Sequence, residues 1–257
     1  MILTIDTGNT HTVLGFVDDE MKVVKSFRLP TDVKETDSGY AVKISQLMEI
    51  TGITADDIEG MIISSVAPSV TGTLAKALKM ITGYDPMIVG KLDTGLDITA
   101  IPGGMIAPDL EVGAIAVKEL YPLPSIVIDM GTATTVTVVD GKGAYIGGAI
   151  MPGVKTALKG MVEGTSLLPD IDIEAPDKCI AVDTIPSMQS GLVYGSAGAI
   201  DGIIDRFVEE MGEEPASIVC TGGLGRLIGR ICRHDMIFDD DLLLKGLYIV
   251  WSACKSK

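Results

Sequence analysis

Short apolar runs recur along the chain, separated by turn residues or by amphipathic stretches. Asp37-Ser38 can cap a helix whose apolar positions keep a spacing of three to four residues, and Gly52 ends it. Similar patterns predict further helices over residues 69–80, 108–120, 156–161, 184–211 and 242–255. Buried strands are predicted at residues 61–63, 87–89 and 217–220. This alternation of strands and helices predicts an α/β fold.

The opening segment recurs in the middle of the chain. Residues 5–13 (IDTGNTHTV) match residues 128–136 (IDMGTATTV), with Asp, Gly, Thr and Val in register. In both copies an apolar run precedes the aspartate and two further runs follow it, which predicts a strand meander used twice. The sequence therefore predicts two similar α/β halves, residues 1–121 and 122–257, that meet near Tyr121-Pro122-Leu123-Pro124.

The two repeated turns suggest phosphate chemistry. Gly8 and Gly131 permit sharp turns whose N–H groups can point at phosphate oxygens, and neighbouring threonines add hydroxyl donors. Asp6 and Asp129 would repel a phosphate, so they fit only if a cation bridges each carboxylate to it. We therefore expect both turns to face one nucleotide site that contains bound cations.

The composition of the chain argues against several classes of function. The formal net charge of -15 would repel phosphate backbones and anionic membrane surfaces, which argues against nucleic-acid and membrane binding. No apolar stretch is long enough to span a bilayer, and no basic leader precedes the first strand. The four cysteines form no Cys-x-x-Cys pair, so we expect reduced thiols, no zinc site and a cytoplasmic location.

Several blocks together carry a family resemblance. They are residues 6–10, residues 129–135, Met188-Gln189-Ser190-Gly191 and Thr221-Gly222-Gly223-Leu224. In this order and spacing the chain resembles type III pantothenate kinases over nearly its whole length. The resemblance implies an actin-like ATPase fold with two ribonuclease H-like halves, each a mixed sheet flanked by helices. It also implies a homodimer that phosphorylates pantothenate with ATP, Mg²⁺ and a monovalent cation, K⁺ or NH₄⁺, in the first step of coenzyme A biosynthesis.

The resemblance also assigns residues. It implies ATP binding by the first turn and by Thr132, that is, by Asp6, Thr7, Gly8, Asn9, Thr10, His11, Thr12, Val13 and Thr132. The residues themselves add Gly222 and Gly223, because a buried strand that ends in a glycine pair allows a flat ring system to lie against the backbone. The Gly222-Gly223 pair would lie against the adenosine, and Asp129 would hold the monovalent cation. Pantothenate would contact Ala107, Pro108, Asp109, Leu110 and Thr184. Asp109 would be the general base, although acids are also common in the first turn of any helix, whose field would lower the pKa of this carboxyl.

The substrate half departs from the family pattern. The family's Gly-x-Asp-Arg reads Ala107-Pro108-Asp109-Leu110 here, an expected aromatic residue is Ala100, and an expected asparagine is Asp183. Replacing the arginine with leucine removes a cation from a site meant to hold an acid. Three hypotheses remain open: a pantothenate kinase in which Lys91, Lys118 or Lys155 supplies the charge, an ATP-binding paralogue with another substrate or a regulatory role, and a sugar or acetate kinase.

Overall fold

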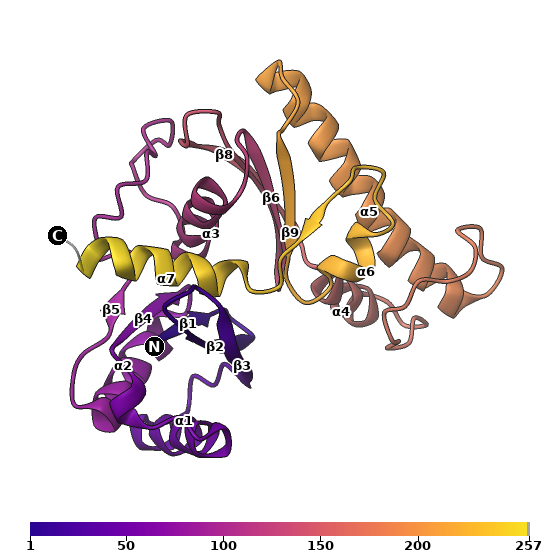
Figure 1. The fold of residues 1–257 in the computed structure, drawn as a ribbon. Helices are drawn as coiled ribbons and strands as arrows, with labels where there is room; N and C mark the ends of the chain where they lie inside the picture. Colours follow the sequence, from indigo (N-terminus) through magenta and orange to yellow (C-terminus); the bar gives the residue numbers. More distant parts are fainter. Residues whose placement is uncertain (256–257) are drawn as a thin grey trace. The chain divides into compact units, whose positions relative to one another are not determined.

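The computed structural model describes residues 1–255, whose helices and strands are labelled in Figure 1. These residues belong to two compact units. Unit 1 comprises Met1–Leu96, Met105–Glu119 and the C-terminal residues from Asp241 onward. Unit 2 comprises Asp97–Gly104 and Leu120–Asp240. The chain therefore crosses between the units four times, instead of once near Tyr121 as the sequence suggested.

Unit 1 is built on a five-stranded sheet in the order β3-β2-β1-β4-β5. Its strands are β1 (Ile2–Thr7), β2 (His11–Val17), β3 (Val23–Pro30), β4 (Gly60–Ser65) and β5 (Met87–Ile88). The first three form an antiparallel meander, while β4 and β5 add in parallel. The carboxyl ends of β1, β4 and β5 therefore lie at one edge of the sheet, where ligand sites are usual in such folds.

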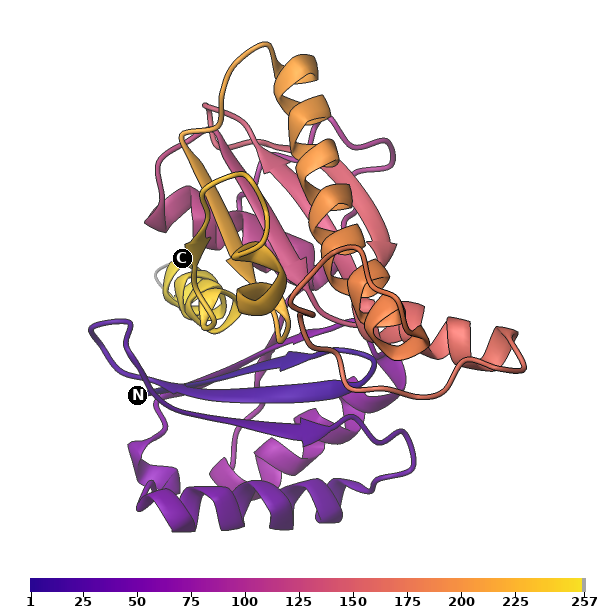
Figure 2. The same cartoon turned by 90° about the vertical axis from the view of Figure 1, so that its right-hand side faces the viewer.

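Helices cover both faces of this sheet. In Figure 2, α1 (Asp37–Thr51) and α2 (Pro68–Thr82) lie on one face and α7 (Leu242–Lys255) on the other. The short η1 (Ala55–Asp57) leads into β4. Side chains alternate along β1, so Leu3 and Ile5 join the core under α1 and α2, while Ile2 joins α7 and α3 (Pro108–Leu120).

Unit 2 repeats this plan with a five-stranded sheet in the order β10-β9-β6-β7-β8. Its elements are β6 (Ser125–Met130), β7 (Ala133–Val139), β8 (Tyr145–Pro152), α4 (Val154–Gly164), α5 (Thr184–Met211), β9 (Ser217–Thr221), α6 (Gly225–Gly229) and β10 (Ile237–Phe238). One core joins the sheet to α4 and α5 through residues such as Ile126, Ile128, Val193 and Ile200. The predicted meander is thus present twice.

The last helix differs from expectation. The sequence grouped residues 242–255 with the second half, but Leu247, Val250 and Trp251 of α7 pack against Ile2 and Ile62 of unit 1. The reason is geometric, because the face of the first sheet away from α1 and α2 has apolar side chains that only a further helix can bury.

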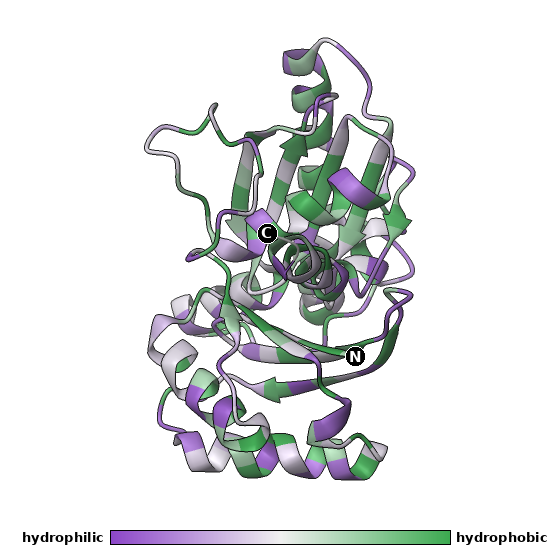
Figure 3. Cartoon of the chain, turned by 60° about the vertical axis from the view of Figure 1, so that its left-hand side comes forward, coloured by the Kyte–Doolittle hydropathy of each residue, from purple (hydrophilic) through white to green (hydrophobic). Residues whose placement is uncertain are grey.

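Hydropathy follows this architecture. Figure 3 shows apolar residues concentrated along the strands, and hydrophilic residues in the connections and on the outer sides of helices. Among residues 1–255, no helix combines the length and the apolar composition that crossing a bilayer requires.

Candidate functional site

The first acidic turn joins β1 to β2 and is closed by its own backbone. Gly8 N–H donates to the His11 carbonyl at 2.9 Å, and the Thr31 hydroxyl donates to the Gly8 carbonyl at 2.8 Å. The Thr12 and Thr31 hydroxyls lie 3.0 Å apart in a second hydrogen bond. Asn9, Thr10 and His11 are exposed, whereas Asp6 is half-buried. The predicted residues 6–13 thus comprise the end of β1, the turn of residues 8–10 and the start of β2, at the carboxyl end of β1.

Two hydroxyls near this turn stand out. Thr7 Oγ1 and Ser64 Oγ are buried and have no hydrogen-bond partner within the described residues. Buried polar groups are normally satisfied, and each exception calls for a reason. Sequence reasoning counted Ser64 only as part of a supporting segment of the family resemblance, residues 64–68, and gave it no role, because the burial and neighbours of a serine at the end of an apolar strand are not visible in the sequence.

Asp109 lies in the first turn of α3, within the same unit. Its Oδ1 accepts a hydrogen bond from the Leu110 N–H at 2.8 Å. Burial raises the pKa of the Asp109 carboxyl above its usual range, and this effect exceeds the lowering that the backbone hydrogen bonds produce. The sequence-based expectation of a lowered pKa was therefore wrong, because desolvation outweighs the helix field at this position. A raised pKa makes the carboxylate a stronger base.

The loop after β5 is docked along the first turn of α3. Gly90 lies against Pro108, because a Cβ atom built on Gly90 would stand 3.8 Å from Pro108 Cγ. Further along, the Thr94 hydroxyl donates to Glu111 Oε1. Lys91 lies between these two contacts, is exposed, and forms no ion pair with any described residue.

The positions of the three lysines that could replace the missing arginine differ. Lys118 lies in the last turn of α3, about 13 Å along the helix axis from Asp109 at the usual rise per residue. Lys155 belongs to unit 2. Of the two lysines in unit 1, Lys91 is the one whose loop contacts the segment that contains Ala107, Pro108 and Leu110, so its position favours it over Lys118.

The second acidic turn, between β6 and β7, is one residue shorter than the first. Gly131 N–H donates to the Ala133 carbonyl, two residues on, whereas Gly8 bonds three residues on. The strand partner of Asp129 is therefore Thr135, while that of Asp6 is Val13. The sequence match in register is accurate up to the glycine and shifts by one residue after it.

Two glycines let other segments reach this second turn. A Cβ atom on Gly153 would stand 2.4 Å from the Gly131 carbonyl oxygen, and one on Gly222 would stand 2.6 Å from the Met130 backbone. Gly222 also has a φ of +90°, which favours glycine. Gly153 N–H and the Thr156 hydroxyl both donate to the Thr132 carbonyl, at 3.1 and 2.6 Å. Asp129, Thr132 and Gly222 thus lie in neighbouring segments of unit 2.

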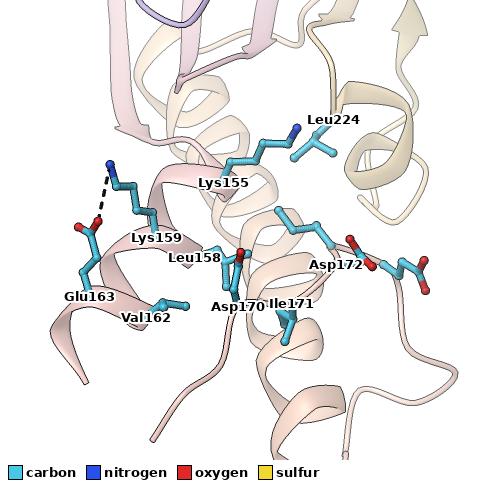
Figure 4. Close-up of a pocket in the computed structure, with 11 residues that line it drawn as sticks. Lys155, Leu158, Lys159, Val162, Glu163, Asp170, Ile171, Asp172 and Leu224 are labelled. Atoms are coloured by element: carbon cyan, nitrogen blue, oxygen red, sulfur yellow. Dashed lines mark ion pairs between the residues drawn. The ribbon is translucent and has the colours of Figure 1, made fainter. Parts of the chain in front are cut away.

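A cavity of about 740 Å³ opens beside this turn, between α4, the segment 170–174 and Leu224 (Figure 4). Leu224 directly follows Gly222-Gly223, so the cavity continues from the predicted adenosine turn. In Figure 4, Lys155 extends toward Leu224, and Lys159 pairs with Glu163 at 3.7 Å. Sequence reasoning named Lys155 and Leu224 but missed the cavity that they line and its other residues, because nothing in an amphipathic helix and an irregular segment marks a shared cavity.

Thr184 is the first residue of α5 and is exposed. The Met188-Gln189-Ser190-Gly191 block lies in the next turns of the same helix and anchors the preceding loop. Gln189 Nε2 donates to the Asp172 carbonyl at 3.1 Å, and the Ser190 hydroxyl donates to the Cys179 carbonyl at 2.6 Å. The block therefore holds one wall of the cavity in place.

Comparison with known proteins identifies the family. Residues 2–206 match the model of the family described as type III pantothenate kinase. Type III pantothenate kinase from Agathobacter rectalis is 39% identical, over 98% of this chain and 96% of that protein. The enzyme of the same name from Halalkalibacterium halodurans is 38% identical, over 98% of both chains.

Solved structures agree on the fold. A structure from Campylobacter jejuni described as a Baf family transcriptional activator aligns with a TM-score of 0.62, at 17% identity, over 99% of this chain and all of that one. A ROK family glucokinase from Streptomyces griseus, solved with glucose and AMPPNP, aligns with a TM-score of 0.53 at 12% identity, over 99% of this chain and all of that one. These likenesses confirm the expected fold of two mixed sheets flanked by helices. The chain belongs to the type III pantothenate kinase family.

Proposed function

We propose that this protein transfers the γ-phosphoryl group of ATP to the primary hydroxyl of pantothenate, the first step of coenzyme A biosynthesis. The observation that carries the proposal is the likeness to type III pantothenate kinases over 98% of the chain. The raised pKa of Asp109 supports it, because a stronger base suits an alcohol nucleophile.

The nucleotide would be held by the residues of both acidic turns. Asp6, Thr7, Gly8, Asn9, Thr10, His11, Thr12 and Val13 in unit 1, with Thr132 in unit 2, offer backbone N–H groups and hydroxyls to the phosphates. The cavity beside Gly222, Gly223 and Leu224 has room for the adenosine, since ligand pockets commonly measure about 300–1,000 Å³.

Two kinds of cation belong to this proposal. Within the described part of the chain, no three His, Cys, Asp or Glu side chains gather around one point. A magnesium ion beside Asp6 would therefore take most of its ligands from phosphates and water, as Mg²⁺ usually does. Bound there, it would neutralise charge on the triphosphate. Asp129, half-buried in a strand that is otherwise buried, would hold the monovalent cation, K⁺ or NH₄⁺.

Asp109 would act as the general base. Its carboxylate would accept the proton of the pantothenate hydroxyl as the oxygen–phosphorus bond forms and ADP leaves. Pro108 and Ala107 place this carboxylate at the start of α3, and Thr184 would contact the substrate from α5. Leu110 offers no charge to the substrate carboxylate, so Lys91 is the favoured replacement for the family arginine.

The protein would work as a homodimer in the cytoplasm. The exposed residues Gly191, Gly195 and Gly198 of α5 have no described atom within 4 Å of where a Cβ would stand. This bare face supports packing against a second copy. The four cysteines are free thiols. Burial raises the pKa of Cys220 and Cys232 to about 12, so both stay protonated.

A coupled assay of ATP consumption with Mg²⁺ and K⁺, with and without pantothenate, tests the proposal. Pantothenate-dependent turnover that Asp109→Asn abolishes would support it. ATP binding without any turnover would instead favour the second hypothesis, a diverged ATP-binding protein, which the presence of Ala107 and Leu110 motivates.

A further inference from the structure

Ser64 pairs with Asp6 across two parallel strands. In the register of β1 and β4, Asp6 stands opposite Ser64, just as Leu3 stands opposite Met61 and Ile5 opposite Ile63. Both of those apolar pairs share the core under α1 and α2, which shows that register partners point to the same face. Asp6 and Ser64 are therefore neighbours on the opposite face, at the carboxyl edge of the sheet.

The Ser64 side chain is fully buried, and its Oγ has no hydrogen-bond partner in the described residues. A buried hydroxyl without a partner destabilises the folded state, and alanine would fit the same space without that penalty. An unpartnered buried hydroxyl at this position therefore indicates that a bound ligand supplies its hydrogen-bond partner. The Thr7 hydroxyl is also unpartnered, but Thr7 points to the face of Leu3 and Ile5 and does not share the neighbourhood of Asp6.

The same pairing recurs in unit 2. There Asp129 stands opposite Thr221 in the register of β6 and β9, and Thr221 is buried as well. Four residues earlier on the same strands, the register partners Ser125 and Ser217 share a hydrogen bond of 2.9 Å. Side chains at partner positions of these parallel strands can therefore reach each other. An acid with a buried hydroxyl beside it is a feature of both halves.

We propose that the Ser64 hydroxyl is a positioning group for magnesium, hydrogen-bonded to a water of the ion that Asp6 holds with the triphosphate. Asp6 is half-buried, so a ligand can reach its carboxylate, whereas Ser64 lies fully buried beside it. A water of the ion would extend the reach of the short serine side chain to such a ligand. Mg²⁺ keeps several of its waters in protein sites, and a hydroxyl can accept a hydrogen bond from such a water. The inference rests on the proposed function, because it requires Mg·ATP at the first turn.

Ser64→Ala tests the inference without relying on turnover. We expect the ligand-free variant to unfold at the same or a higher temperature than the wild type. By calorimetry it should bind the analogue AMPPNP with Mg²⁺ about three- to tenfold more weakly, the range for one lost hydrogen bond. In EDTA, without Mg²⁺, both proteins should bind AMPPNP equally. Ser64→Cys, which conserves volume but is a poor hydrogen-bonding group, should behave like Ser64→Ala even if alanine disturbs folding.

Ser65→Ala is the matched control, since the Ser65 hydroxyl already has partners: it accepts from Thr71 Oγ1 at 2.7 Å and from Ala67 N–H at 3.1 Å. It should lower the melting temperature and leave magnesium-dependent binding unchanged. Equal affinity of the wild type and Ser64→Ala for Mg·AMPPNP would overturn the inference, as would an equal loss in EDTA, which would mean direct phosphate contact. A wild type that binds no Mg·AMPPNP would refute the proposed function itself.

Discussion

At Asp109 two physical effects act on one carboxyl in opposite directions. The backbone N–H groups of the first helical turn favour the charged form, and burial disfavours it. Burial is the larger effect, so the pKa rises above its ordinary value of 3.8. An acid that is common at helix starts for structural reasons thereby becomes suited to accepting a proton.

This shift predicts a pH dependence. The base works only when ionised, so kcat/KM for pantothenate should rise with pH through an acidic limb whose pKa lies above 3.8. Asp109→Asn should lower kcat by about 10²- to 10⁴-fold, the usual contribution of a general base. Asp37→Asn, in the first turn of α1, is the matched control and should leave the pH–rate profile unchanged. An Asp109→Asn enzyme with near wild-type kcat would exclude this residue as the base.

The raised pKa of Asp109 also changes how stability depends on pH. The change has the opposite sign from that of an acid whose pKa is lowered by folding. Between 3.8 and the raised pKa the folded state binds more protons than the unfolded state, so stability falls as pH rises through this window. Asparagine does not ionise, so the variant does not lose this stability as the pH rises. We therefore expect Asp109→Asn to unfold at the same or a higher temperature than the wild type at pH 7, measured by calorimetric melting. A clear decrease would mean that the carboxylate stabilises the fold.

Lys91 makes a second prediction at the residue scale. If its ammonium holds the substrate carboxylate, Lys91→Gln should lower kcat/KM for pantothenate roughly 10- to 150-fold, since a hydrogen bond to a charged group contributes about 1.5–3 kcal/mol. Pantothenyl alcohol, which has no carboxylate, should react equally well with both enzymes. Lys118→Gln should affect neither substrate. Equal losses with the acid and the alcohol would show that Lys91 only shapes the loop.

Elements meet at the second acidic turn only because glycines allow it. Gly153→Ala would place a methyl group 2.4 Å from the Gly131 carbonyl oxygen. We expect it to destabilise the protein by about 1–3 kcal/mol, as overpacking does, and to weaken ATP binding. Gly160→Ala, inside the helix α4 that Gly153 precedes and with open space around it, should stabilise by about 0.5–1 kcal/mol. Urea titration of both variants tests the pair, and similar unfolding free energies for the two would contradict the close contact at Gly153.

The elements also show what a sequence can and cannot predict. Apolar periodicity located most helices and strands, and the repeated Asp-x-Gly turns indicated two similar sheets, because both signals are local. The tighter second turn, the short α6 and β10, and the cavity beside Leu224 were missed, because they depend on how segments pack. The lowered pKa expected for Asp109 was wrong for the same reason, since burial is decided by distant residues.

At the scale of the whole molecule, the exposed glycines of α5 allow the proposed homodimer to be tested. If the bare glycine face of α5 forms the proposed dimer contact, the longer side chain of Gly195→Gln should fill it and shift the protein from dimer toward monomer in sedimentation velocity. Gly72→Gln, at an exposed glycine of α2 with equally open space, should leave the sedimentation coefficient unchanged. A wild type that sediments as a monomer would refute the dimer.

The route of the chain through unit 1 affects how the protein is made. β1 leaves the ribosome well before α7, yet α7 covers one face of its sheet. At usual elongation rates of about 5–20 residues per second, the interval between them is roughly 10–50 s. Until α7 arrives, Ile2 and Ile62 remain available to nascent-chain chaperones, so the first half to be synthesised is among the last to complete its core.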